Sequence, residues 1–266
     1  MLKTAKQIGL SLFLILLFSS VAQAAKLDDI LESGKIRIGV SMFTPWAMKD
    51  ASGKLKGFEI DVANRLAEDM GVKAEFKEVV WENIISSLNN DEFDVIISGM
   101  AITPARALKI NFSIPYAESG TALATNISKT KDIKTMAELN QPEIKIAVVS
   151  KTLGADLAQL LFDKATIKAF TDTALAEKSI LDGDSHAYVA SMIETNFLML
   201  NNPEVVDLPL AKPLMVSKAG MAVKRGNQEL LNFLNAWITA RNADRWLQTR
   251  HKYWFKTLKW QEDVSK

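Results

Sequence analysis

The chain has 266 residues, with 32 lysines and arginines against 31 acidic residues, so its formal net charge is +1. This balance argues against a nucleic-acid-binding chain, for which a clustered excess of basic residues is typical. The absence of cysteine excludes a disulfide framework and any cysteine chemistry.

The first 24 residues have the pattern of a secretory signal peptide. Lys3 and Lys6 form a basic start, an apolar stretch covers residues 8–21, and a small-x-small sequence ends at Ala24. The alternative is a membrane anchor, but the stretch is short for a span of about 20 residues, so we expect cleavage after Ala24. Removal leaves 30 basic against 31 acidic residues, and no cysteine can carry a lipid. We therefore expect a soluble periplasmic protein.

Strand-like and helix-like segments alternate along the mature chain, which predicts an α/β fold. Residues 35–40 alternate with period two, as a half-buried strand does. Apolar residues four apart before Gly71 predict a helix that ends at this glycine. The expected strands cover residues 35–40, 72–80, 93–97, 144–149, 167–170, 187–190 and 219–223, and the expected helices cover residues 57–70, 81–88, 153–162, 173–181, 194–200 and 228–254.

One segment combines a buried strand, a turn and a helix start suited to an anion. Gly99 allows the backbone to approach a ligand closely. Thr103 is a good N-cap and Pro104 fits the first helical position, which places Arg106 in the first turn. A cation there opposes the helix dipole unless a negative ligand is bound, and the guanidinium could grip a carboxylate. The alternative is a surface arginine at an ordinary helix start.

Several short segments are diagnostic through their order and spacing. They are residues 34–40 (GKIRIGV), 45–46 (PW), 53–61 (GKLKGFEID), 102–106 (ITPAR), 112–116 (FSIPY) and 232–238 (NFLNAWI). Through these segments the chain resembles the extracellular solute-binding proteins, family 3, which feed polar amino acids to ABC importers. The resemblance implies the type II periplasmic binding protein fold, with two α/β lobes joined by two crossing strands near residues 121–126 and 216–221. It implies a signal peptide at 1–24, a first lobe from 25–122 and 218–266, and a second lobe from 123–217.

The resemblance also assigns roles in a ligand cleft. Arg106 matches the arginine that binds the α-carboxylate, and Gly99 matches the position whose carbonyl takes the ammonium. Phe43 and Trp81 match positions that flank the ligand's side chain, with core packing as the alternative. Thr152 matches the threonine at a helix start of the second lobe that completes the carboxylate site.

Departures from the family pattern bear on the ligand. Lys151 stands where the family has glycine, Ala101 replaces a hydroxyl residue, and Ser191 replaces the aspartate that pairs with the ammonium. Because a buried ammonium without a counter-charge is costly, either Glu194 supplies the charge or the ligand lacks a standard ammonium. Lys151 near Arg106 would favour a more anionic or atypical solute. The alternatives are a solvated lysine at 151 and an exposed helix acid at 194.

These features predict a monomeric binding protein that delivers a small carboxylate-bearing solute, an amino acid or a similar compound, to an ABC permease in the inner membrane. No cofactor, metal or nucleic acid is expected. His186 and His251 have no metal-ligand spacing, and the sequence holds no Gly-x-Ser-x-Gly or phosphate-loop motif. We therefore expect no catalytic residues.

An enzyme remains the alternative. Periplasmic cyclohexadienyl dehydratases have the same fold and resemble the chain around residues 112–116. They eliminate water and carbon dioxide from prephenate or arogenate with a carboxylic acid as proton donor, a role that needs a desolvated glutamate with a raised pKa. Glu194 is the candidate. Prephenate, a dicarboxylate without an ammonium, would suit Arg106, Lys151 and the missing aspartate.

Overall fold

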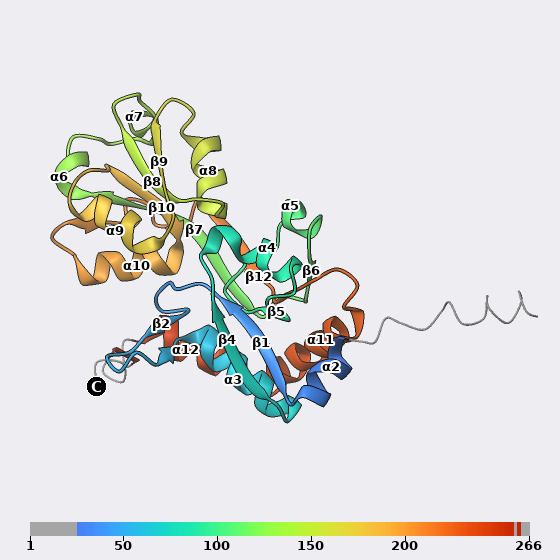
Figure 1. Cartoon of the computed structure of the whole chain (residues 1–266). Helices are drawn as coiled ribbons and strands as arrows, with labels where there is room; N and C mark the ends of the chain where they lie inside the picture. Colours follow the sequence, from blue (N-terminus) through green and yellow to red (C-terminus); the bar gives the residue numbers. More distant parts are fainter. Residues whose placement is uncertain (1–25, 258–259, 262–266) are drawn as a thin grey trace, which may run out of the picture.

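The computed structural model describes residues 26–257, 260 and 261, so the predicted signal peptide lies outside the described residues. The described chain folds into two α/β lobes joined by crossing strands (Figure 1). Within the described ranges, no helix is long and apolar enough to cross a lipid bilayer.

The first lobe is built on a five-stranded sheet in the order β4-β1-β5-β13-β6. β1 pairs in parallel with β4 and β5, whereas β13 pairs antiparallel with β5 and β6. Ile36 and Ile38 of β1 are fully buried and Arg37 between them is not, as the alternating pattern predicts. The strands are β1 (Lys35–Val40), β4 (Lys73–Glu78), β5 (Val95–Ile96), β6 (Asn111–Phe112) and β13 (Ala222–Val223).

Helices cover both faces of this sheet. Val95 packs into the core formed with α2, α3, α11 and α12, whereas Ile96 faces the cluster formed with α4. Successive β5 residues thus pack against the helix layers on opposite faces of the sheet. The remaining elements of this lobe are α2 (Lys26–Ser33), the hairpin β2 (Met48–Lys49) and β3 (Leu55–Lys56), α3 (Phe58–Met70), the 3-10 turn η1 (Trp81–Asn83), α4 (Ile84–Asn89), α5 (Pro104–Ala107), α11 (Gln228–Ala243) and α12 (Trp246–Lys256).

The second lobe has its own sheet in the order β11-β7-β10-β8-β9, with β12 added to β7. α8 packs against one face of this sheet, and α9 and α10 pack against the other. The elements are β7 (Ala117–Asn126), α6 (Ile127–Thr130), α7 (Met136–Leu139), β8 (Lys145–Val149), α8 (Leu153–Leu161), β9 (Thr166–Phe170), α9 (Thr173–Leu181), β10 (Ala187–Ser191), α10 (Met192–Asn201), β11 (Val206–Asp207) and β12 (Met215–Ala219).

The long strand β7 and the shorter β12 connect the two lobes (Figure 1). The first half of β7 pairs antiparallel with β12, and its second half pairs with β10. At the first-lobe end, the backbone N–H of Ile102 donates to the carbonyl of Lys218 at 2.9 Å, and that of Gly220 donates to Met100 at 3.0 Å. The end of β12 is therefore bonded directly to the loop that follows β5.

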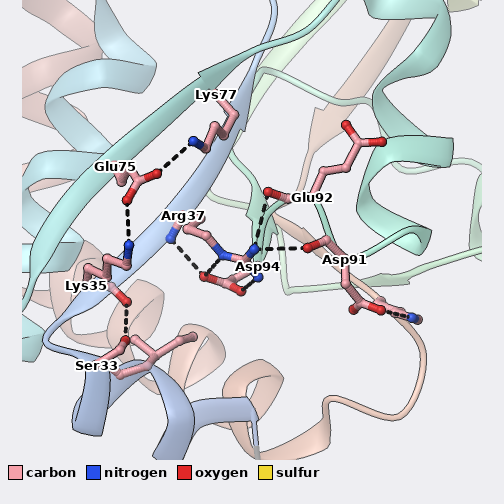
Figure 2. Close-up of polar contacts among 10 residues, drawn as sticks. Ser33, Lys35, Arg37, Glu75, Lys77, Asp91, Glu92 and Asp94 are labelled. Atoms are coloured by element: carbon pink, nitrogen blue, oxygen red, sulfur yellow. Dashed lines mark hydrogen bonds and ion pairs between the residues drawn. The ribbon is translucent and has the colours of Figure 1, made fainter.

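A polar cluster fixes β1 to the segment that leads into β5 (Figure 2). Nη2 of Arg37 donates to Oδ1 of the buried Asp94 at 2.6 Å, and Nη1 donates to the carbonyl of Asp91 at 3.0 Å. The exposed ion pairs of Glu75 with its lysine neighbours contribute little stability. Because Asp94 is buried, its pairing with Arg37 anchors the start of β5 to β1.

The main disagreement with the predicted elements lies near the C-terminal end. The predicted helix over residues 228–254 is two helices, α11 and α12, which meet at Arg245 with φ of 64°. The apolar spacing continues across this break, so periodicity alone gives no stop signal. The predicted helix over 81–88 begins with the 3-10 turn η1 before α4. Hairpin β2–β3 and the short α2, α6, α7, β6 and β11 are not among the predicted elements.

Candidate functional site

A cavity of about 350 Å³ lies between the lobes and takes its walls from both. The first lobe contributes the segments after β1, β4 and β5, the second contributes the starts of α8, α9 and α10, and β7 adds residues 119–121. Most residues that the sequence singled out line it: Phe43, Trp81, Gly99, Ala101, Arg106, Thr152, Ser191 and Glu194.

Arg106 is held by its position in a capped helix and by three groups around its guanidinium, namely two backbone carbonyls and an indole ring. Thr103 caps α5 by accepting the backbone N–H of Arg106 at 3.3 Å. Nη1 donates to the carbonyl of Ala101 at 2.9 Å, and Nη2 donates across the cleft to the carbonyl of Lys151 at 3.2 Å. The guanidinium lies 5.4 Å from the ring centre of Trp81, as in a cation–π contact. Since arginine has five N–H donors, others remain for a ligand.

Aromatic rings form the first-lobe wall of the cavity. The ring centres of Phe43 and Trp81 are 6.4 Å apart in an edge-to-face arrangement, and both side chains are half-buried. Trp46 lies behind Phe43 at 5.8 Å and is buried in the core. Phe43 and Trp81 thus present ring surface to the cavity, and Trp46 supports them.

Gly99 occupies a position where a side chain would be strained and crowded. Its φ is 58°, and a Cβ placed there would lie 3.0 Å from Cζ of Phe43 and 3.2 Å from Cε3 of Trp46. The backbone N–H of Gly99 donates to the hydroxyl of Tyr116 at 3.3 Å, and this hydroxyl donates to the carboxyl group of Glu59, whose oxygens both lie at 2.8 Å. Hydrogen bonds therefore connect the loop that carries Gly99 to the residue before β7 and to α3.

Glu59 is a buried acid that the sequence analysis did not single out. Its side chain is fully buried, and desolvation raises its pKa to about 8 against the opposing effect of the Tyr116 hydrogen bond. Its only sequence signal is its place beside Phe58 in the segment GFEID. A polar residue between the apolar residues of a helix start does not by itself reveal burial.

Lys151 does not line the cavity. Its ammonium forms an ion pair with Glu82 of the first lobe at 2.8 Å, and both side chains are exposed. Its backbone has φ of 58°, a conformation that glycine adopts without strain and other residues rarely adopt. Its carbonyl accepts from Nε1 of Trp81 at 3.1 Å as well as from Arg106. Lys151 thus joins the lobes mainly through its backbone.

Thr152 begins α8 on the second-lobe side. Its hydroxyl accepts the backbone N–H of Ala155 at 3.1 Å and donates to the carbonyl of Val149 at 2.7 Å. This cap orders the start of the helix at the cavity wall.

Ser191 and Glu194 form a reciprocal cap at the start of α10. The hydroxyl of Ser191 accepts the N–H of Glu194 at 3.2 Å, and Glu194 accepts the N–H of Ser191 at 3.1 Å. The hydroxyl of Thr173 donates to Glu194 at 3.1 Å. Glu194 is buried rather than exposed, and desolvation raises its pKa against these hydrogen bonds.

Metal-site geometry is not found among the described residues. No group of three or more histidine, aspartate or glutamate side chains is placed to hold a metal ion there. Nδ1 of His186 accepts the backbone N–H of Lys145 at 3.1 Å, and His186 is not part of the cavity wall.

Comparison with known proteins places this fold and cleft in one family. Residues 36–257 match the family described as bacterial extracellular solute-binding proteins, family 3. The chain belongs to this family.

Individual relatives include binding proteins and an enzyme. A cyclohexadienyl dehydratase of Pseudomonas aeruginosa is 26% identical over 236 residues, which cover 88% of each chain. The L-cystine-binding protein TcyJ of Escherichia coli K12 is 25% identical over 89% of this chain and 88% of its own. The crystal structure of the ancestral amino acid-binding protein AncCDT-1, a precursor of cyclohexadienyl dehydratase, is 32% identical, has a TM-score of 0.79, and is matched over 87% of this chain and 100% of that one.

Proposed function

We propose that this protein is the periplasmic binding component of an ABC importer and that its cleft captures an amino acid or a similar carboxylate-bearing solute. The observation that carries this is the guanidinium of Arg106, held by the carbonyls of Ala101 and Lys151 on the wall of an interlobe cavity. A guanidinium oriented in advance binds a carboxylate with little further loss of freedom. The relatives named above include proteins that bind L-cystine or another amino acid.

The remaining wall residues supply the rest of the ligand site. The carbonyl of Gly99 and the carboxylate of Glu194 bind the ammonium. Ser191 lacks the carboxylate that the family uses for this purpose, and Ala101 lacks the hydroxyl. Phe43 and Trp81 flank the ligand's side chain, and Thr152 orders the facing helix start. The ammonium of Lys151 is committed to Glu82, which removes the main reason for expecting an anionic solute.

The proposed cellular setting follows from the N-terminal pattern and the family. The signal peptide is removed after Ala24, and the mature protein acts as a monomer in the periplasm. The first lobe, 25–122 with 218–266, and the second lobe, 123–217, close on the solute and present it to a permease of the inner membrane.

A ligand screen tests this proposal. Thermal unfolding of the mature protein is followed with each common amino acid, several dicarboxylates and prephenate. A ligand that binds only the native state raises the melting temperature. We expect at least one amino acid to do so and calorimetry to confirm it at one site. If no amino acid stabilises the protein, the proposal is wrong.

A dehydratase is the second candidate, and Glu194 is the observation that favours it. A buried carboxyl with a raised pKa on the cavity wall has the property required of a general acid at neutral pH. One relative is a cyclohexadienyl dehydratase.

Product formation separates the two candidates. The protein is incubated with prephenate and with arogenate, and phenylpyruvate and phenylalanine are measured. We expect no turnover. Product that disappears in Glu194→Gln would assign the enzyme function instead.

A further inference from the structure

The apolar side chains of α10 are divided between the cores of the two lobes. Leu198 packs into a core of the second lobe, whereas Ile193 and Phe197 pack into the core that α3, α11 and α12 form in the first lobe. Ile193 and Phe197 lie four residues apart on one face of the helix and are both buried. Figure 1 shows α10 at the edge of the second lobe that faces the first. The helix is therefore a contact between the lobes in addition to that of Lys151.

Trp260, near the C-terminal end of the chain, is the aromatic partner of Phe197. The two ring centres lie 5.3 Å apart in an edge-to-face arrangement, and Trp260 is only 4% exposed. This is a favoured arrangement for a pair of aromatic rings. Phe197 belongs to the second lobe and Trp260 follows the last helix of the first lobe, so the pair joins the lobes.

Trp254 of α12 connects Trp260 to the first lobe. The ring centres of the two tryptophans lie 5.6 Å apart, and Nε1 of Trp254 donates to Oδ2 of Asp61 in α3 at 2.7 Å. Nε of Arg250 donates to the same carboxylate oxygen at 3.0 Å. Trp260 therefore has a defined place relative to α3, and a second lobe that moved away from the first would separate Phe197 from Trp260.

The start of α10 is part of the cavity wall. Ser191 and Glu194 line the cavity, and Glu194 lies about one helical turn before Phe197. A contact that holds Phe197 against the first lobe also holds this helix start at the cavity. Trp260 itself lies outside the wall that the described residues form, so its effect on a solute is transmitted through α10.

We propose that Trp260 is a strap between the lobes, which holds α10 against the first lobe, favours the closed arrangement described here and slows release of the solute. The part that concerns the solute rests on the proposed binding function. A contact that exists only while the lobes are together shifts their equilibrium toward the closed form, with or without solute. A solute that requires the closed form is then bound more tightly.

Because the chain has no cysteine, spin labels can report directly on the distance between the lobes. Labels are attached at Lys54→Cys in the first lobe and Glu204→Cys in the second, two exposed positions, and their separation is measured by double electron–electron resonance without and with solute. We expect Trp260→Ala to reduce the population at the distance of the closed arrangement. Trp246→Ala is the matched control, because the ring that it removes contacts Trp237 within the first lobe.

Stopped-flow kinetics tests the effect on the solute. The probe is the compound that raises the melting temperature most in the ligand screen. We expect Trp260→Ala to speed its dissociation about five-fold and to leave the association rate nearly unchanged. Phe197→Leu removes the other ring, should act similarly, and provides the result if Trp260→Ala does not fold. The two substitutions together should add little to either alone, because they remove the same contact.

The possible outcomes separate the strap from the binding function. Distance distributions that neither Trp260→Ala nor Phe197→Leu changes would overturn the strap, as would an equal change in Trp246→Ala. A changed distribution with unchanged dissociation would overturn the effect on solute release. If no compound of the screen binds, the proposed function is wrong, and the distances in the ligand-free protein still decide whether Trp260 holds the lobes together.

Discussion

Arg106 of the first lobe donates to the backbone carbonyl of Lys151 in the second lobe at 3.2 Å. The same carbonyl accepts from the indole of Trp81 at 3.1 Å. Two residues of the proposed ligand site therefore also hold the lobes together. The contact between the lobes and the orientation of the guanidinium both depend on this one carbonyl, which belongs to a residue with left-handed backbone.

Replacement of Lys151 by glycine separates its backbone role from its charge. Glycine adopts φ of 58° without strain, so Lys151→Gly keeps the carbonyl in place. The exposed pair with Glu82 contributes at most about 1 kcal/mol. We expect ligand affinity to change by less than about three-fold in calorimetry. A ten-fold or greater loss would instead indicate that the ammonium contacts the ligand.

Gly99→Ala should destabilise the protein by about 2–4 kcal/mol in urea unfolding, because strain at positive φ adds to the clash with Phe43 and Trp46. Gly53→Ala is the matched control: φ is 82° there, and nothing lies within 4 Å of an added Cβ. The control should lose only about 1–2 kcal/mol. Equal losses would show that the rings do not restrict position 99.

Glu59 predicts a specific dependence of stability on pH. The unfolded chain loses this proton near pH 4.5, whereas the folded protein keeps it up to about pH 8. The free energy of unfolding therefore falls as pH rises between these values, by up to about 4 kcal/mol from about pH 5 to pH 8. Glu59→Gln should abolish this decrease in urea titrations.

The exposed Glu68→Gln provides the control for Glu59, and it should retain the pH dependence of the unmodified protein. If Glu59→Gln also retains the full decrease, the carboxyl group of Glu59 is not the group that titrates.

Local patterns were sufficient to predict most of the fold. The alternation around Ile36 and Ile38, and the glycine stop at Gly71 with φ of 72°, identify β1 and α3 with nearly correct bounds. The break at Arg245 was not predictable, because neither glycine nor proline marks it. Short strands such as β6 depend on pairing partners distant in sequence, and local patterns do not contain these.

The sequence was sufficient to predict which residues line the cleft. It was not sufficient to predict the charged partners of those residues. Thr103, Pro104 and Arg106 lie where local capping rules place them. The side-chain partner of Lys151 could not be inferred, because Glu82 belongs to the other lobe and lies far from Lys151 in the sequence.

The central claim is that Arg106 anchors the carboxylate of an amino acid, and one measurement tests it most directly. Calorimetry compares the unmodified protein with Arg106→Ala, using the amino acid that gives the largest shift in melting temperature, with Arg225→Ala as a surface control. We predict at least about a hundred-fold loss of affinity in Arg106→Ala and no change in the control, because a charge-assisted pair is lost. Unchanged affinity in a folded Arg106→Ala protein would contradict the account.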